Sequence, residues 1–222
     1  GGGSGGKEDM SVTHNAGVVA WVLKRPDKVL RTRQESTINH HKRHDMEMDL
    51  TTACDAEGRL TAMKAVIVSD TGAYASLGGP VLQRACTHAA GPYNYQVIDI
   101  EGTAVYTNNP PAGAFRGFGV SQTAFATENN LNLLAELVGI SPWEIRRLNA
   151  IRPGAVLPNG PIADPSAGMD ERSDAHRESY GGAEAEGKAG GMASSLKQAG
   201  LGAGTPEHTP CAREVTGGKG TV

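Results

Sequence analysis

The stretch Gly113-Ala-Phe-Arg-Gly-Phe-Gly119 places one arginine and two phenylalanines between glycines, directly ahead of a predicted helix. It continues the run Tyr106-Thr-Asn-Asn-Pro-Pro-Ala-Gly113. Glycines allow the backbone to approach a ligand closely, and successive N–H groups near a helix start can bind anions or oxo groups. These residues alone leave two interpretations of equal weight: a site for an anionic ligand, or a tight turn with a packed phenylalanine.

Predicted helices and a predicted hairpin flank this glycine-rich run. Downstream, a long amphipathic helix ends at Gly139, and another begins at the capping box Ser141-Pro-Trp-Glu144 and ends before Pro153. Upstream, alternation of apolar and polar residues over 45–70, around the turn Asp55-Ala-Glu-Gly58, predicts a hairpin. The apolar face of the long helix is assigned to Phe125, Leu131, Leu134, Leu137 and Val138.

Three further segments complete the predicted elements. Apolar residues at helical spacing predict a helix over 11–24 that Pro26 stops, and Pro80 and Gly91 bracket a short helix over 81–90. A strand is expected over 96–106. This mixture of strands and helices predicts an α+β fold with mixed sheets and packed helices.

Composition limits the classes of function. The 222 residues carry a net charge of −3 and no long basic run interleaved with aromatics, which argues against nucleic acid as a partner. No apolar stretch approaches the roughly 20 residues that span a bilayer, and no secretory signal pattern opens the sequence, so a cytoplasmic location is expected. Cys54, Cys86 and Cys211 are widely separated, so we expect small buried side chains rather than disulfides, iron–sulfur ligands or zinc ligands.

The glycine-rich run also carries a family resemblance. With Thr107-Asn-Asn-Pro-Pro before it and Ser121-Gln after it, the run is similar to the molybdopterin-contacting segment of the xanthine dehydrogenase and aldehyde oxidoreductase family of molybdenum hydroxylases. The resemblance continues through 133–146 and 149–154 and covers roughly residues 1–163. It is strongest to the molybdenum-binding subunit of bacterial xanthine dehydrogenases. It implies a molybdopterin-binding domain of the aldehyde oxidoreductase type, present here in incomplete form.

The resemblance assigns roles to residues of two segments. Ala114 and Arg116 would bind the molybdenum–molybdopterin cofactor, and Phe118 would stack on a flat heteroaromatic substrate. The segment 81–93 resembles the one that supplies the substrate arginine, which is Arg84 here and would stabilise negative charge on a purine oxygen. The alternative for Arg84 is an ordinary helix arginine in a surface ion pair.

The first eight residues resemble a glycine-rich cofactor loop of the same family. Gly3, Ser4 and Gly5 would contact the cofactor, although the family usually has phenylalanine where Ser4 stands, and the run also resembles an expression linker. Glu8 matches the carboxylate that orients substrate through the ring nitrogens in xanthine-type members. Its alternative role is that of an acid that complements the dipole of the following helix.

The run His40-His-Lys-Arg-His44 invites a metal-site interpretation. We interpret it as lying between a strand and the hairpin, with no carboxylate or cysteine at ligand spacing. Mixed histidine and basic runs are usually solvated, and the family also carries a basic-histidine patch here, so no metal site is predicted.

The chain is expected to contain three parts and to be incomplete at both ends. Residues 1–163 form the molybdopterin-binding-like domain, 164–190 a linker or disordered loop, and 191–222 the truncated start of a second molybdopterin-binding module. No residue matches the family's glutamine-glycine cofactor loop or its general-base glutamate. The resemblance therefore implies that the cofactor is shared with a missing C-terminal part and that this chain alone is inactive. It also implies iron–sulfur and FAD partner subunits.

Three functional hypotheses follow. The leading one is a fragment of a hydroxylase that oxidises purines, such as xanthine-like N-heterocycles, with water as the oxygen source. Aldehyde oxidation by the same family is the alternative enzyme activity, but Glu8 and Arg84 together favour purines because an aldehyde needs fewer polar anchors. The third hypothesis is a non-catalytic remnant that binds no cofactor.

Overall fold

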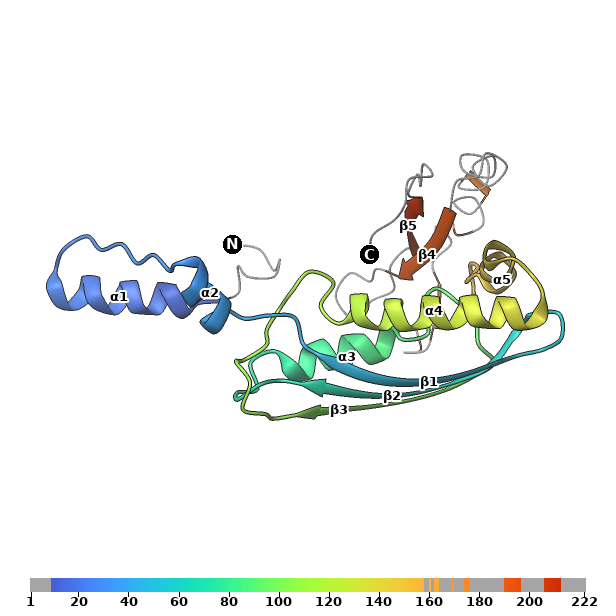
Figure 1. Ribbon diagram of the computed structural model, residues 1–222, viewed down its shortest axis with the longest axis horizontal. Coiled ribbons are helices and arrows are strands. Elements are labelled where there is room, and N and C mark those ends of the chain that lie inside the picture. The colour runs from blue at the N-terminus through green and yellow to red at the C-terminus, as the bar shows by residue number, and fades with distance from the viewer. Residues whose placement is uncertain are drawn as a thin grey trace, which may run out of the picture. The chain divides into compact units, whose positions relative to one another are not determined.

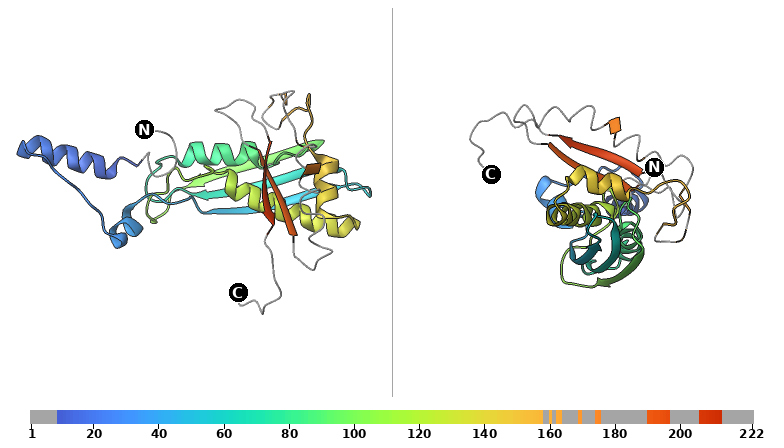
Figure 2. Two further views of the ribbon diagram at one scale, coloured as in Figure 1. Left: turned by 90° about the horizontal axis from the view of Figure 1, so that it is seen from above. Right: turned by 90° about the vertical axis from the view of Figure 1, so that its right-hand side faces the viewer.

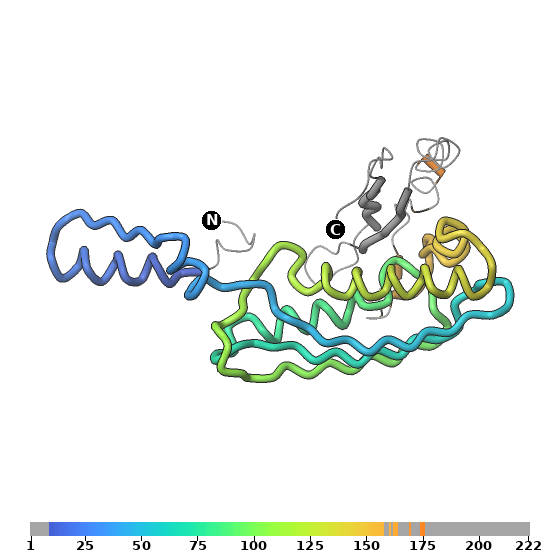
Figure 3. The backbone as a smooth tube through the Cα atoms, viewed as in Figure 1, coloured from blue at the N-terminus to red at the C-terminus, as the bar shows by residue number. Residues whose placement is uncertain are grey.

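The computed structural model describes residues 9–157, 160, 162, 163, 169, 174, 175, 190–196 and 206–212. Figures 1 and 3 follow the chain through its helices and strands. The chain divides into two compact units, and both are discontinuous in sequence. Unit 1 comprises Gly1–Asp49, Val66–Cys86 and Glu101–Gln122, and unit 2 comprises Leu50–Ala65, Thr87–Ile100 and Thr123–Val222. The α+β class predicted from the sequence is confirmed.

A three-stranded sheet has the order β1-β2-β3. The strands are β1 (Met46–Cys54), β2 (Leu60–Asp70) and β3 (Val97–Val105). The turn between β1 and β2 is closed by the Asp55 side chain, which accepts from the backbone N–H of Glu57 at 3.1 Å and of Arg59 at 2.7 Å. This turn confirms the predicted hairpin, because aspartate at such a position satisfies the local backbone donors.

Unit 1 contains most of helix α3, which lies against β3 at Gly102. Helix α3 (Gly78–His88) begins three residues before the predicted position, so Pro80 lies inside its first turn. A Cβ added at Gly102 of β3 would lie 2.5 Å from Sγ of Cys86 and 3.1 Å from Cδ1 of Leu82. The glycine is therefore what allows the helix to approach the strand so closely.

Two further helices, α1 (Ser11–Leu23) and α2 (Arg33–Asn39), belong to unit 1. Helix α1 confirms the predicted helix, but none of its residues is buried, and Trp21 is 75% exposed. Helix α2 was not predicted: the run at 40–44 follows a helix, so the interpretation that it follows a strand was wrong. The signal for α2 is a capping box in which Thr32 and Glu35 satisfy each other's backbone N–H groups.

Unit 2 contains most of α4 (Val120–Val138) and all of α5 (Pro142–Asn149). Gly139, with φ of +74°, ends α4 as predicted, and the Ser141 capping box begins α5 as predicted. Figure 2 follows α4 into α5 from two further directions. Among the apolar residues assigned to the buried face of α4, Leu131 and Leu134 are buried, but Phe125 is 73% and Leu137 81% exposed, so that part of the prediction was wrong.

A network of buried hydrogen bonds explains why α4 does not bury the whole of the apolar face predicted for it. Thr127 on its buried side donates to the carbonyl of Ala89 at 2.6 Å. Glu128 accepts from the hydroxyl of Tyr93 at 2.6 Å and from Nε of Arg146 at 2.7 Å. These buried hydrogen bonds satisfy groups that would be costly to leave unpaired, so they help fix the orientation of the helix.

The strands β4 (Gly190–Leu196) and β5 (Pro206–Ala212) pair antiparallel, with Gly190 opposite Ala212. The expected linker at 164–190 lies outside the described residues except at Met169, Asp174, Ala175 and Gly190. The division into 1–163, 164–190 and 191–222 stays a prediction. Within the described part of the chain, no helix is long and apolar enough to cross a bilayer.

Candidate functional site

The glycine-rich run at 113–119 forms a tight loop that leads into α4. Phe118 donates its N–H to the carbonyl of Phe115 at 2.7 Å, and Val120 donates to Gly117 at 3.0 Å. The φ angles are +95° at Gly117, +51° at Phe118 and +97° at Gly119. A positive φ is uncommon for phenylalanine, and such strain is typical of functional sites. The loop predicted ahead of a helix is confirmed.

The loop packs closely against the start of α3. A Cβ at Gly119 would collide with the carbonyl oxygen of Val81 and would lie 3.0 Å from the backbone nitrogen of Ala85. Both the positive φ and this close contact require glycine. The end of the loop is therefore packed against the first two turns of α3.

This contact brings two of the predicted site residues together. The guanidinium carbon of Arg84, on α3, lies 5.9 Å from the centroid of the Phe118 ring. Both residues are half-buried. A guanidinium beside an aromatic face is a cation–π arrangement, and together they offer a planar and a positive surface.

The other predicted site residues are placed only in part. Ala114 is 5% exposed, whereas the side chain of Arg116 is exposed on the same loop. The remaining ones, Gly3, Ser4, Gly5 and Glu8, lie outside the described residues.

Arg43 contacts the loop, although no pattern in the sequence assigned it to the site. Its Nη2 donates to the carbonyl of Arg116 at 2.6 Å, and its guanidinium carbon lies 4.7 Å from the Phe115 ring centroid. Its Nη1 lies 3.5 Å from Oε1 of Gln122. Burial lowers the pKa of Arg43, but an arginine stays charged at any working pH. The hydrogen-bond partners are 73 and 79 residues away in sequence, so no local pattern could have indicated them.

The three histidines of the run at 40–44 lie in different surroundings. Nδ1 of His40 is 2.5 Å from Oδ2 of Asp9. The ring of His41 lies where a Cβ at Gly113 would come within 2.7 Å of it. His44 is 2% exposed, and burial lowers its pKa, opposed by the nearby charge of Asp70. The run thus contributes to packing around the loop.

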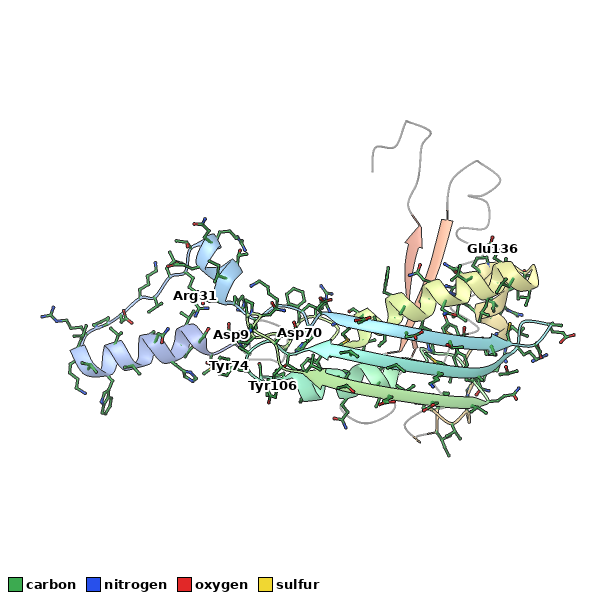
Figure 4. The ribbon with its side chains drawn as sticks, turned by 60° about the horizontal axis from the view of Figure 1, so that its bottom comes forward. Asp9, Arg31, Asp70, Tyr74, Tyr106 and Glu136 are labelled. Carbon is green, nitrogen blue, oxygen red and sulfur yellow. The ribbon has the colours of Figure 1, made fainter. Side chains whose placement is uncertain are left out.

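Asp70, at the end of β2, anchors the segment that enters the loop. It accepts hydrogen bonds from Oγ1 of Thr107 at 2.7 Å, Nδ2 of Asn109 at 2.5 Å and the N–H of Gly72 at 2.7 Å. These three donors lower the pKa of its carboxyl group. Figure 4 labels Asp70 beside Tyr106, where this segment leaves β3. The carboxylate is already engaged as an acceptor, so its role is to hold the backbone.

The donor chemistry of the loop suits an anionic cofactor. Arg116 offers an exposed guanidinium, whose planar fork matches phosphate and similar oxygen-rich groups. Phe118 lies two residues further along the same loop, and Arg84 lies on helix α3, 5.9 Å from the Phe118 ring centroid. Fold and loop together define an α+β domain with a glycine-rich loop between β3 and α4.

Comparison with known proteins identifies the class. Residues 1–150 match the family described as "Molybdopterin cofactor-binding domain", and the chain belongs to this family. The family resemblance found in the sequence is thereby confirmed. The molybdenum hydroxylase oxidoreductases are its wider group.

Two curated relatives are close in sequence. The chain is 43% identical over 178 residues to the "Nicotinate dehydrogenase large molybdopterin subunit" of Eubacterium barkeri, covering 80% of this chain and 42% of that protein. It is 45% identical over 153 residues to a protein of Bacillus subtilis named as one subunit of a "Probable xanthine dehydrogenase", covering 69% of this chain and 20% of that protein. The chain thus spans less than half the length of either relative.

Solved structures agree with the fold. The aldehyde oxidoreductase of Desulfovibrio gigas superposes with a TM-score of 0.77 at 30% identity, over 82% of this chain and 21% of that one. The aldehyde oxidoreductase of Desulfovibrio desulfuricans gives 0.80 at 28% identity, over 90% and 23%. The prediction of a domain of the aldehyde oxidoreductase type is confirmed.

Proposed function

We propose that the chain is part of a molybdenum hydroxylase that oxidises purine-like N-heterocycles, with water as the oxygen source. The single observation that carries the proposal is the approach of Arg84 to Phe118, 5.9 Å from guanidinium carbon to ring centroid. A flat ring with an electronegative substituent needs a planar surface and a positive group at one place, and these two side chains provide both.

Each residue has a distinct role in this proposal. Phe118 stacks on the heteroaromatic ring and fixes its plane. Arg84 donates to a substrate oxygen and stabilises the negative charge that develops there during attack on the ring. Glu8 accepts from or donates to the ring nitrogens and fixes the in-plane orientation, as the resemblance implies.

The cofactor contacts are assigned to the glycine-rich segments. Arg116 and Ala114, together with Gly3, Ser4 and Gly5, would hold molybdopterin. When bound, molybdenum–molybdopterin supplies the redox chemistry of the hydroxylation, while protein groups orient and stabilise the reactants. The remainder of the molybdenum subunit, an iron–sulfur subunit and an FAD subunit complete the proposed enzyme, so the chain by itself is inactive.

A second candidate substrate is a heteroaromatic carboxylate. The relative with 43% identity is named for nicotinate, and a guanidinium such as that of Arg84 pairs readily with a carboxylate. Aldehyde oxidation remains the alternative that the names of the two superposed structures suggest. Both alternatives use the same cofactor and differ in what Arg84 contacts.

The first test measures molybdenum and pterin in the chain purified with and without the subunits that associate with it. Stoichiometric cofactor in the assembled complex supports the hydroxylase. Absence from every preparation supports a non-catalytic remnant.

The second test compares substrates. Arg84→Ala should lower turnover of xanthine about 100-fold, the usual effect of losing one donor to a developing oxyanion, and should change turnover of an aromatic aldehyde far less. The exposed neighbour Gln83→Ala on the same helix serves as the control. Equal losses on both substrates would contradict the purine assignment, and preferential loss with nicotinate would favour the carboxylate.

A further inference from the structure

The segment His41–His44 contacts the start of the loop at 113–119 and the first turn of α4, which follows the loop. At the entrance, Gly113 donates its N–H to the carbonyl of Lys42 at 3.0 Å, and Lys42 forms an isolated parallel bridge with Ala112. At the exit, Nε2 of Gln122 donates to the carbonyl of His44 at 3.0 Å. The backbone of one short segment therefore accepts hydrogen bonds from the start of the loop and from the helix turn that follows it.

Arg43 contacts the middle of the same loop. Its guanidinium donates to the carbonyl of Arg116 at 2.6 Å while its face covers the Phe115 ring at 4.7 Å. The carbonyl of Arg116 belongs to the peptide that joins Arg116 to Gly117, just ahead of the positive φ angles at Gly117 and Phe118. Fixing that peptide plane limits the conformations open to Arg116 and Gly117, and it therefore restrains the backbone that leads into Phe118.

The geometry points to Arg43 as a positioning residue of the cofactor and substrate loop. It acts through the Arg116 peptide and holds Phe118 in its positive-φ conformation beside Arg84. This inference rests on the function proposed above, because the value of the positioned side chains lies in what they bind. Arg43 itself touches neither cofactor nor substrate in this assignment.

The planar shape of the guanidinium is what the role requires. One face lies against an aromatic ring, while two different nitrogens reach the Arg116 carbonyl and the Gln122 side chain. Lysine carries the same charge as a single point and cannot make these contacts together. Arg43→Lys, which keeps only the charge, should therefore not restore the conformation of the loop.

The role is local, which separates it from a general contribution to stability. Arg43 is half-buried, and the ring and the two oxygens that its guanidinium contacts all belong to residues 115–122. A positive φ at phenylalanine costs free energy, so the loop should relax when its external support is lost. Relaxation should show at the amides of Phe118 and Val120, which close the two turns of the loop.

The experiment compares the unchanged chain with Arg43→Gln, Arg43→Lys and the control Arg25→Gln, whose arginine is exposed in the same unit. Hydrogen exchange of peptides covering 113–122 and the rate of tryptic cleavage after Arg116 are measured without any cofactor. Cleavage after the exposed Lys28 provides the internal reference. Both Arg43 variants should speed loop exchange and cleavage about tenfold, the effect of losing a charged hydrogen bond. Arg25→Gln should change neither rate.

Three results would overturn the inference: unchanged rates in Arg43→Gln, a uniform increase over the whole chain, or full recovery in Arg43→Lys. Pterin retained by the assembled complex provides the separate readout. If the unchanged chain retains none, the proposed function fails, while the exchange data still decide whether Arg43 holds the loop. If it retains pterin and Arg43→Gln retains as much with an unaltered loop, the positioning role fails and the proposed function stands.

Discussion

Arg146 is fully buried and donates its Nε to Oε2 of Glu128 at 2.7 Å. Its Nη2 also donates to the carbonyl of Glu128 at 3.0 Å and to Oδ1 of Asn132 at 2.9 Å, and its Nη1 donates to the carbonyl of Pro142 at 2.7 Å. One guanidinium thus ties α5 to α4 in unit 2 through charge-assisted hydrogen bonds.

Arg146→Ala should destabilise the chain by about 3–5 kcal/mol, because it leaves the buried Glu128 carboxylate without its opposite charge. The measurement is the free energy of unfolding from urea titration. The control is Arg147→Ala: Arg147 pairs with Asp174 at 3.2 Å, but both side chains are about half exposed, at 47% and 51%. Such a surface pair should contribute less than about 1 kcal/mol. Similar losses of unfolding free energy in the two variants would show that the buried contacts of Arg146 contribute no more than a surface ion pair.

The turns and helix ends could be predicted from the sequence, but the buried face of α4 could not. The Asp55 turn, the Gly139 stop and the Ser141 cap are encoded within a few residues, and each was found where predicted. The buried face of α4 depends instead on partners from distant segments. Apolar spacing at Phe125 and Leu137 could not reveal that Thr127 and Glu128 would be the buried neighbours.

The candidate site divides in the same way. The resemblance to a known family assigned the glycine-rich loop and Arg84 to the candidate site, and their roles stay predictions. Arg43 was not assigned to it, because its contacts arise from tertiary structure alone. Helix α2 could have been predicted, since Thr32 and Glu35 form the same capping signal that revealed α5.

Removing the cap of α5 should have a moderate effect. The hydroxyl of Ser141 accepts from the N–H of Glu144 at 3.1 Å, and the Glu144 carboxylate accepts from the N–H of Ser141 at 2.8 Å. Ser141→Ala should lower the free energy of unfolding by about 1 kcal/mol, because one helix N–H loses its acceptor. Thr13→Ala in the first turn of α1, where the side chain is exposed, is the control and should stay within about 0.5 kcal/mol.

Burial of His44 should make stability depend on pH. Burial lowers the pKa of its imidazole below the ordinary value of 6.5, so the unfolded chain binds a proton more readily than the folded chain. The stabilisation that this group contributes is therefore fully present above a pH of about 6.5. It is lost as the pH falls from there through the folded-state pKa.

The test compares unfolding free energies from about pH 8 to about pH 5, which brackets the imidazole range. In the unchanged chain the free energy of unfolding should fall as the pH is lowered, and His44→Gln should make this decrease smaller. The exposed His14 on α1 gives the control variant His14→Gln, which should retain the full decline. A decline of the same steepness in all three chains would remove His44 as its source.

Gly119 and Gly139 differ in their surroundings although both have positive φ, +97° and +74°. A Cβ at Gly139 would meet no atom within 4 Å, so Gly139→Ala should cost only the left-handed backbone strain of about 1–2 kcal/mol. A Cβ at Gly119 would collide with the carbonyl of Val81, which adds overpacking of about 1–3 kcal/mol. Urea titration of both variants measures the difference.

Because the collision pushes the loop away from α3, Gly119→Ala should also separate Phe118 from Arg84 and weaken pterin retention, whereas Gly139→Ala should leave retention unchanged. Equal stability losses for the two substitutions would mean that the loop does not pack against α3 as closely as described.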